Sequence, residues 1–383
     1  MLTWKDVLEV EETQDRRKFG IMCPDIAVYR QGRALILDIP GEEFRVLSSG
    51  FTNGGYMESP QAVMNISGIG GKAEYSCMLG GLEEFDRSVE AYVKKLGYEP
   101  DRCVCMTTAA NMDNAILTEV VSSDGIRVST VITGGIRHNG GRAGDPTTYD
   151  EAAHVGNEKS GTIIILMSID ADLSESSMLA SLTMATEAKS CVVQELQARS
   201  LYTPDIATGS GTDQVAVISH KGSDVMVETL LRDSPLAVAI SECVSKGLRL
   251  ALAKQSGMDV ELQSDVMTVL SRYNLVQDSI REEMRFSASM DELMAALEDV
   301  RRDKYLASMA MGVLHIQDDI RNGRVSEDEG LCAAKTICRS AVLDGSLSPL
   351  EDLRFESSED IVELVSYVSA LKLIRRVEER RGH

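Results

Sequence analysis

Four segments of this sequence combine glycine with small polar side chains, a mixture that permits close approach of the backbone to a ligand. Each segment lies beside a predicted strand, where loops commonly carry binding and catalytic groups. The four segments are residues 48–55, 107–111, 133–145 and 208–213. One such segment alone is usually a turn, but four in the same two thirds of the chain indicate a binding site.

Two residues in and beside these segments have the chemistry of amide cleavage. Thr162 begins an apolar run directly after Ser160 and Gly161, where glycine leaves room for hydroxyl attack or for self-cleavage. Asn139 has five glycines close by, which can bring its side chain and backbone amides to one point. A hydroxyl nucleophile and amide donors for an oxyanion are groups that amide cleavage requires.

Each candidate also has a purely structural interpretation. Thr162 can simply begin a buried strand, as β-branched residues often do, and Asn139 can be a turn residue that tolerates positive φ. Glu187 and Lys189 fit a solvated helix face, and Asp213 fits a cap at the start of a strand. We favour a functional role for Asn139 and leave both interpretations open for the others.

The sequence carries no recognisable motif for a metal or a nucleotide. Its five histidines form neither H-x-x-x-H nor H-E-x-x-H, and the glycine patterns of phosphate loops are missing. None of its eight cysteines forms C-x-x-C. Cys103 and Cys105 are two apart, a spacing typical of one face of a strand and poor for zinc. We therefore expect no cofactor, and reduced, buried thiols.

The composition favours a globular protein that binds neither nucleic acid nor membranes. Of 383 residues, 60 are acidic and 39 are lysine or arginine, which gives a net charge of -21. Such a charge repels phosphate backbones and anionic membrane surfaces. No apolar run approaches the roughly 20 residues of a membrane-spanning helix, and no apolar signal region follows the first residues. We expect the protein in the cytoplasm.

The elements that must position these segments are mixed in the first two thirds of the chain. Short β-branched runs predict strands at residues 34–39, 44–48, 102–107, 116–121, 126–133, 162–169 and 214–219. The run 162–169 is continuously apolar, which predicts a central strand buried on both faces. Residues 122–125 predict a hairpin turn. Helices are predicted at residues 84–96, 174–199 and 235–254, the second capped by Asp172 or Ser174.

After about Gly257 the strand signals stop and amphipathic helices predominate. Their patterns cover residues 258–273, 289–323 and 326–345, and a last stretch begins near residue 359. The fold class is therefore α+β, with a mixed-sheet domain at residues 1–256 and an all-α domain at residues 257–383. Because the second domain carries no glycine-rich polar segment, we expect it to serve assembly or docking.

Together the glycine-rich segments resemble the adenosylcobinamide amidohydrolase family. In family order, between about residues 44 and 219, the matches are LSSGFTNGG with Asn65 downstream, TTAAN, TGGIRHNGGRAGD, SGTIIIL, ATEAKSCVVQEL and ATGSGTDQVAV. That family cleaves the amide that joins aminopropanol to the corrin ring of adenosylcobinamide, and the adenosylcobyric acid released re-enters cobalamin synthesis. A G-x-H-T-x-x-G-like segment of the family has no clear match at residues 220–225, and the last third lies outside the resemblance.

The resemblance implies a corrinoid substrate, to which the missing motifs and the net charge add the expectation of no cofactor and no nucleic-acid or membrane partner; a homo-oligomer stays open. The residues expected to bind the substrate are Asn53, Gly54, Asn65, Asn111, Gly135, Arg142, Asp145, Gly209, Gly211 and Thr212.

A second resemblance bears on mechanism. Residues 161–173 resemble the nucleophile strand of the β-aminopeptidase and ornithine acetyltransferase fold, where a Ser or Thr after a self-cleaved bond attacks. This implies that Thr162 is the nucleophile and that the layers run helix, sheet, sheet, helix. From its position among the glycines, Asn139 is expected to help hold the oxyanion. A freed α-amine, with a reference pKa of about 8, can be the base. In an intact chain Glu187 and Asp213 are the candidate bases.

Two other functions stay open. One is a self-processing N-terminal-nucleophile peptidase or acyltransferase of this second fold. The other is a corrinoid-binding protein without catalysis, although the D-x-H-x-x-G motif of corrinoid carriers is missing.

Overall fold

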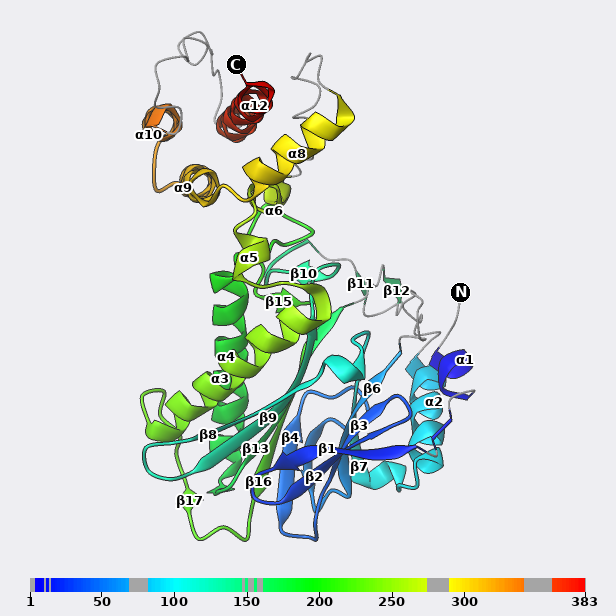
Figure 1. Cartoon of the computed structure of the whole chain (residues 1–383). Helices are drawn as coiled ribbons and strands as arrows, with labels where there is room; N and C mark the ends of the chain where they lie inside the picture. Colours follow the sequence, from blue (N-terminus) through cyan, green and yellow to red (C-terminus); the bar gives the residue numbers. More distant parts are fainter. Residues whose placement is uncertain are drawn as a thin grey trace. The chain divides into compact units, whose positions relative to one another are not determined.

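The computed structural model describes residues 4–9, 12–13, 15–68, 82–146, 149–150, 155–156, 161–273, 289–340 and 360–382. The chain forms two compact units, Met1–Asp259 and Val260–His383 (Figure 1). All the residues proposed above for chemistry or substrate binding belong to the first unit.

Two sheets pack face to face in the first unit. In spatial order, the six-stranded sheet contains β5 (Gly55–Glu58), β4 (Phe44–Ser48), β16 (Gln214–His220), β13 (Thr162–Ile169), β9 (Arg127–Gly135) and β8 (Ile116–Val121). The five-stranded sheet contains β1 (Arg16–Met22), β2 (Ile26–Gln31), β3 (Ala34–Asp38), β6 (Ala62–Ser67) and β7 (Cys103–Thr108). Between them lies an apolar core that includes Leu37 and Val63 from one sheet and Ile164 and Leu166 from the other.

Helices cover the outer face of each sheet (Figure 1). Helices α3 (Glu175–Glu195) and α4 (Pro235–Ser256) pack on the six-stranded sheet, and α1 (Trp4–Glu9) and α2 (Leu82–Lys95) on the five-stranded sheet. Trp4 packs edge-on against Phe85 of α2, with ring centroids 5.5 Å apart. The α+β class and the helix, sheet, sheet, helix layering expected from the sequence are confirmed.

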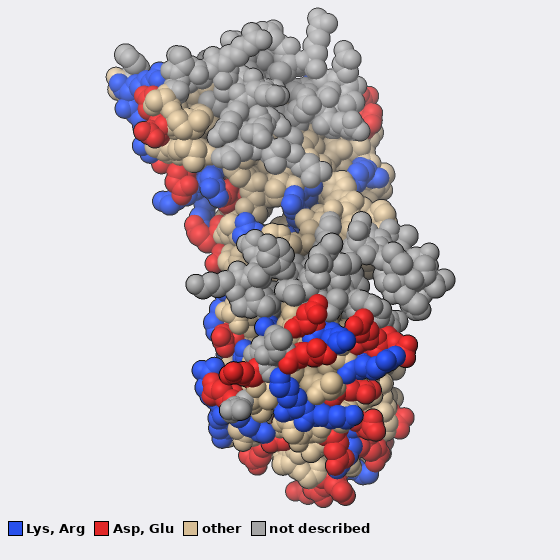
Figure 2. Space-filling model, turned by 90° about the vertical axis from the view of Figure 1, so that its right-hand side faces the viewer, with Lys and Arg blue, Asp and Glu red and all other residues tan. Residues whose placement is uncertain are grey.

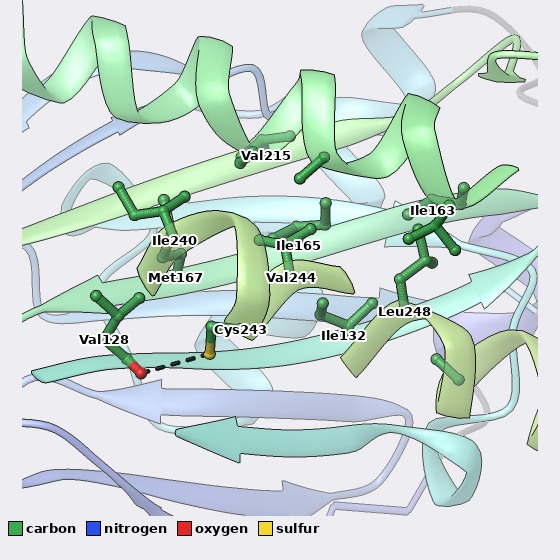
Figure 3. Close-up of a cluster of buried hydrophobic side chains, with 14 of the residues drawn as sticks. Val128, Ile132, Ile163, Ile165, Met167, Val215, Ile240, Cys243, Val244 and Leu248 are labelled. Atoms are coloured by element: carbon green, nitrogen blue, oxygen red, sulfur yellow. Dashed lines mark hydrogen bonds between the residues drawn. The ribbon is translucent and has the colours of Figure 1, made fainter. Parts of the chain in front are cut away.

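Strand β13 lies inside the six-stranded sheet, as its continuous apolar run predicts, and all of its side chains are buried. Figure 3 shows Ile163, Ile165 and Met167 on the side of Val244 and Leu248 of α4. Since side chains alternate along a strand, the even-numbered residues face the other sheet. Thr162 therefore begins β13 on the face that lies between the two sheets.

The other predicted elements hold with small shifts at their ends. Strands at residues 44–48 and 116–121 have the predicted bounds, and the turn between β8 and β9 closes with Gly125 at φ 91°. Helix α4 begins after Ser234, whose side chain accepts from Ala237 N, and ends at Gly257 in the left-handed region. Strands β1, β2, β5 and β6 are not predicted by the pattern.

Helix α3 corrects one expectation about capping. Ser174, not Asp172, is the cap, because the Ser174 hydroxyl accepts from Ser177 N. Asp172 lies in the short strand β14 (Asp172–Leu173), where its carboxylate pairs with Arg45. The helix also ends at Glu195, four residues before the predicted end, and Gln197 follows with φ 52°.

The second unit, where described, is helical and has its own core. Its elements are α5 (Val260–Gln263), α6 (Val266–Leu270), η3 (Ser271–Tyr273), α8 (Met290–Arg301), α9 (Lys304–Arg321), α10 (Glu327–Ser340) and α12 (Asp360–Arg381). Ser289 and Glu292 form a capping box at the start of α8. The predicted helix end near residue 345 and the predicted helix start near residue 359 lie outside the described residues. Inside the unit, Asp318 pairs with Arg272 and accepts from Tyr273 Oη at 2.7 Å.

Charges of both signs are interspersed on the face of the protein that Figure 2 shows. Among the described helices, none is long and apolar enough to cross a bilayer.

Candidate active site

Thr162 is buried at the start of β13, with 2% of its surface exposed. Its hydroxyl donates to the carbonyl oxygen of Thr212 at 2.6 Å. The preceding Gly161 has φ 143°, and a Cβ there would lie 2.5 Å from the carbonyl oxygen of Gly135. Only glycine fits this position, so the backbone that leads into Thr162 depends on it.

The carbonyl of Gly161 is held by two side-chain donors. Asn139 Nδ2 donates to the Gly161 oxygen at 2.6 Å, and Thr212 Oγ1 donates to it at 3.2 Å. Two donors thus converge on a carbonyl oxygen directly beside a hydroxyl. Cleavage of an amide requires this combination, because the donors stabilise the charge that develops on the oxygen.

The loop that carries Asn139 is fastened to the segment that carries Thr212. Strands β10 (Gly140–Gly141) and β15 (Gly209–Ser210) pair there. A Cβ on Gly140 would lie 2.6 Å from the carbonyl oxygen of Arg199, so this contact also needs glycine. Pairing of these two strands places Asn139, which is 3% exposed, against residues about 70 positions later in the sequence.

Asp145 braces the same loop. Its carboxylate accepts from Arg142 N at 2.6 Å, from Ser200 Oγ at 2.6 Å and from Thr203 Oγ1 at 2.7 Å. Burial alone would raise the pKa of Asp145, but these hydrogen bonds and the Arg142 charge lower it below its ordinary value. The Arg142 guanidinium in turn donates to the carbonyl oxygen of Ile206 at 3.1 Å.

Asp213 and Lys189 form a buried ion pair beside the start of β13. Lys189 Nζ lies 2.5 Å from Asp213 Oδ2, and each side chain is 10% exposed. The second oxygen of Asp213 accepts from Ile163 N at 2.9 Å and from Ser210 Oγ at 2.5 Å. A Cβ on Gly209 would collide with both members of the pair. Asp213 therefore fixes the backbone immediately after Thr162, and its described hydrogen bonds do not include the Thr162 hydroxyl.

Glu187 is not brought to this site. It lies on the exposed face of α3 and pairs with Arg232 at 3.4 Å, where the side chains are 46% and 82% exposed. Lys189, two residues later, turns inward to Asp213. The sequence did hold a signal for this difference, because Lys189 is four residues after Ala185 and three before Val192, on the apolar stripe of the helix.

Besides Thr212, which bonds to the Thr162 hydroxyl, three further predicted binding residues lie near Thr162 or on the strands next to it. Gly135 is its neighbour on β9. A Cβ on Gly211 would lie 3.9 Å from Asn139 Oδ1. Asn65 is 1% exposed, faces the six-stranded sheet and donates from Nδ2 to Thr133 Oγ1 at 2.8 Å.

Three others have local structural contacts instead. Asn111 caps η2 (Met112–Asn114) through Asp113 N. Asn53, at φ 55°, donates from Nδ2 to the carbonyl oxygens of Pro100 and Cys103. Gly54 lies where a Cβ would collide with the carbonyl oxygen of Gly50. The hydrogen bonds described for Asn53 and Asn111 do not reach Thr162.

Cysteine and metal chemistry are not evident in the described residues. Burial raises the pKa of Cys103 to about 12 and raises that of Cys105 as well, which disfavours a thiolate at either position. Within the described ranges, histidine, cysteine and acidic side chains do not gather into groups of three that could hold a metal ion.

Comparison with known proteins agrees with the sequence motifs. The family model described as adenosylcobinamide amidohydrolase matches residues 23–259. The uncharacterized protein MJ1613 of Methanocaldococcus jannaschii is 29% identical over 180 residues, which cover 44% of this chain and 69% of that protein.

Two solved structures show remote similarity. One is the PH0078 protein from Pyrococcus horikoshii OT3, with a TM-score of 0.30, 14% identity and coverage of 64% of this chain and 83% of that chain. The other is the L-aminopeptidase D-Ala-esterase/amidase from Ochrobactrum anthropi, with a TM-score of 0.28, 12% identity and coverage of 68% and 90%. TM-scores this low have no bearing on the chemistry of the site. The family match covers more than half of the chain and all of the residues around Thr162, and the chain therefore belongs to the adenosylcobinamide amidohydrolase family.

Proposed function

We propose that this protein hydrolyses the amide that joins aminopropanol to the corrin ring of adenosylcobinamide, releasing adenosylcobyric acid. One observation supports this activity above the others. The Thr162 hydroxyl lies beside a carbonyl oxygen that two side chains, Asn139 and Thr212, already hold by hydrogen bonds. The family supplies the substrate class, and the geometry supplies the groups for cleaving an amide.

In the proposed reaction the Thr162 oxygen attacks the substrate carbonyl carbon and loses its proton to a base. Asn139 Nδ2 donates to the oxyanion, the C–N bond breaks, and aminopropanol leaves with a proton. Water then hydrolyses the ester on Thr162. This restores the hydroxyl and releases the carboxylic acid, so the sum is hydrolysis of one amide.

The contacts in the intact chain suggest where the base comes from. The Thr162 hydroxyl donates to a backbone carbonyl, which is too weak a base to take its proton. Attack of Thr162 Oγ1 on the Gly161 carbonyl, followed by hydrolysis, would leave a Gly161 carboxylate and a free Thr162 amine. That amine would have a pKa near 8 before environmental shifts. The same cleavage would release the two donors that hold the Gly161 carbonyl in the intact chain.

The activity is tested by incubating the purified protein with adenosylcobinamide and separating the corrinoids by chromatography. Adenosylcobyric acid and free aminopropanol are expected in equal amounts. Tight binding of adenosylcobinamide without either product would instead favour a corrinoid-binding protein.

Replacing Asn139 with alanine is expected to slow turnover by about 100- to 1000-fold, the usual effect of removing one oxyanion donor. The fall should be in kcat, because the donor acts on charge that develops only in the transition state. Steady-state kinetics on adenosylcobinamide measures it. An Asn139→Ala protein that loses affinity but keeps kcat would mean that Asn139 binds substrate instead.

Turnover is also proposed to need no added metal or nucleotide. Dialysis against EDTA is expected to leave kcat unchanged, since the proposed donors and nucleophile are all side chains of the protein. Loss of activity in EDTA that one divalent metal restores would contradict this.

We also propose a reducing compartment such as the cytoplasm, which the free thiols of the described cysteines support.

A further inference from the structure

Gln214 is a buried polar residue of the ATGSGTDQVAV segment that is not among the predicted site residues. It begins β16, is 1% exposed, and its side chain lies on the face between the two sheets. Its Nε2 donates to the carbonyl oxygen of Thr107 in β7 at 3.2 Å and to that of Thr212 at 3.3 Å. Both acceptors are carbonyl oxygens, so the identity of the donor nitrogen is unambiguous.

The Thr212 carbonyl makes this contact important for the reacting hydroxyl. The same oxygen accepts from Thr162 Oγ1 at 2.6 Å. A carbonyl oxygen has two lone pairs, so it can accept from Gln214 and Thr162 together. The direction in which this carbonyl points sets the rotamer of Thr162 and the direction of its hydroxyl.

Thr212 also touches the other reacting group. Its Oγ1 donates to the Gly161 carbonyl oxygen at 3.2 Å, beside Asn139 Nδ2. A shift of Thr212 would therefore disturb the nucleophile and the oxyanion donors in one movement. Gln214 holds Thr212 from the side of the five-stranded sheet, through its second bond to Thr107.

We propose that Gln214 is a positioning residue, which aligns the Thr162 hydroxyl by holding the Thr212 carbonyl. It acts through the Thr212 carbonyl, and its described hydrogen bonds do not include the Thr162 oxygen. The kinetic part of this inference rests on the proposed amidohydrolase activity. Its structural part, the alignment of Thr162, does not.

The fold is expected to tolerate loss of this amide. Gln214 Oε1 has no hydrogen-bond partner in the described part of the chain, and such a buried acceptor costs stability. Methionine has nearly the same shape and no such group. Gln214→Met should therefore fold with little change in melting temperature, although the Thr212 carbonyl is no longer held.

Gln31 offers a matched control in the same unit. It is 8% exposed, its Nε2 donates to the carbonyl oxygen of Thr13 at 2.7 Å, and its Oε1 also has no partner among the described residues. It ends β2 in the five-stranded sheet. Gln31→Met removes an equivalent buried amide without touching Thr212, so it reports the purely structural effect.

The first test compares kcat, KM and melting temperature for Gln214→Met, Gln31→Met and the parent protein. Misplacing a reacting group by about 1 Å can cost about 100-fold in rate, so kcat of Gln214→Met is expected to fall by about 10- to 100-fold. KM and melting temperature should change no more than in Gln31→Met. Unchanged kcat, or an equal fall in both variants, would overturn the proposal.

The pH dependence of activity in Gln214→Glu provides a second test, because a purely structural role of Gln214 would not change it. A protonated carboxyl can donate to the Thr212 carbonyl, but a carboxylate cannot. Activity of Gln214→Glu should therefore rise relative to the parent as the pH falls. A constant ratio between the two proteins across pH would count against alignment by this hydrogen bond.

A last measurement does not need turnover. With ¹³C-labelled threonine methyl groups, the three-bond couplings of the Thr162 methyl carbon report its χ1 rotamer. Thr162→Ser identifies the resonance because it removes that methyl group. One rotamer is expected in the parent and in Gln31→Met, and averaging in Gln214→Met. A fixed Thr162 rotamer in Gln214→Met refutes the inference. A parent that fails to cleave adenosylcobinamide would refute the proposed function alone.

Discussion

Thr162→Ala is expected to abolish turnover of adenosylcobinamide while leaving corrinoid binding nearly unchanged. The substitution removes the proposed nucleophile. Any remaining acceleration over the uncatalysed hydrolysis in water can come only from the oxyanion donors and from substrate binding. Thr162 is 2% exposed and its hydroxyl has one described acceptor, so the loss of one hydrogen bond should not unfold the unit. Product formation and the equilibrium dissociation constant are measured separately to distinguish chemistry from binding.

Thr162→Ser is the matched variant, because it keeps the hydroxyl and removes only a methyl group. It is expected to retain measurable activity. Intact mass spectrometry on the parent and both variants reveals whether the chain breaks between Gly161 and Thr162, and Thr162→Ala should stay whole. Near-normal turnover by Thr162→Ala would end the nucleophile hypothesis and leave the family assignment untouched.

Lys189→Met is expected to destabilise the first unit by about 3–5 kcal/mol, the usual result of removing one partner from a buried ion pair. The Asp213 carboxylate would be left buried with hydrogen bonds but without its cation. Equilibrium urea unfolding measures the effect. Because Asp213 fixes Ile163 N, turnover should fall as well.

Two controls separate charge from packing in this prediction. Adding Asp213→Asn to Lys189→Met should recover part of the lost stability, since the unpaired charge is then gone. Glu187 lies on α3, as Lys189 does, and its exposed partner is Arg232, which Arg232→Met removes. Exposed ion pairs contribute only about 0–1 kcal/mol to stability. Equal losses from Lys189→Met and Arg232→Met would show that the buried pair has no special role.

Local patterns predicted the strands and helices well where one physical signal dominated. Residues 162–169 were predicted because a strand buried on both faces must be apolar throughout. Strand β1 was missed because its sequence, RRKFGIM, is that of a largely exposed edge strand with charged residues. Strand β6 was missed because Asn65 interrupts its apolar run, although Asn65 is buried and bonded across the sheets.

The sequence predicted which segments contain the residues of the candidate site, but not which of these residues contact each other. The sequence indicated Asn139, Thr162, Thr212 and Asp213, which the structure brings together. It could not indicate that Asn139 holds the Gly161 carbonyl, because that contact depends on the pairing of β9 with β13 and on the path of the loop that follows β9. The spacing of Lys189 from Ala185 and Val192 places it on the apolar stripe of α3, apart from Glu187, but the sequence could not show that its partner is Asp213.

The packing of Trp4 has a practical consequence for these measurements. It is the single tryptophan of the chain, and it is buried against Phe85 in the first unit. Its fluorescence on excitation at the red edge of protein absorption therefore reports only the unit that carries Thr162. A chain with two separate cores can melt in two steps, and this intrinsic probe assigns one of those steps without any added label.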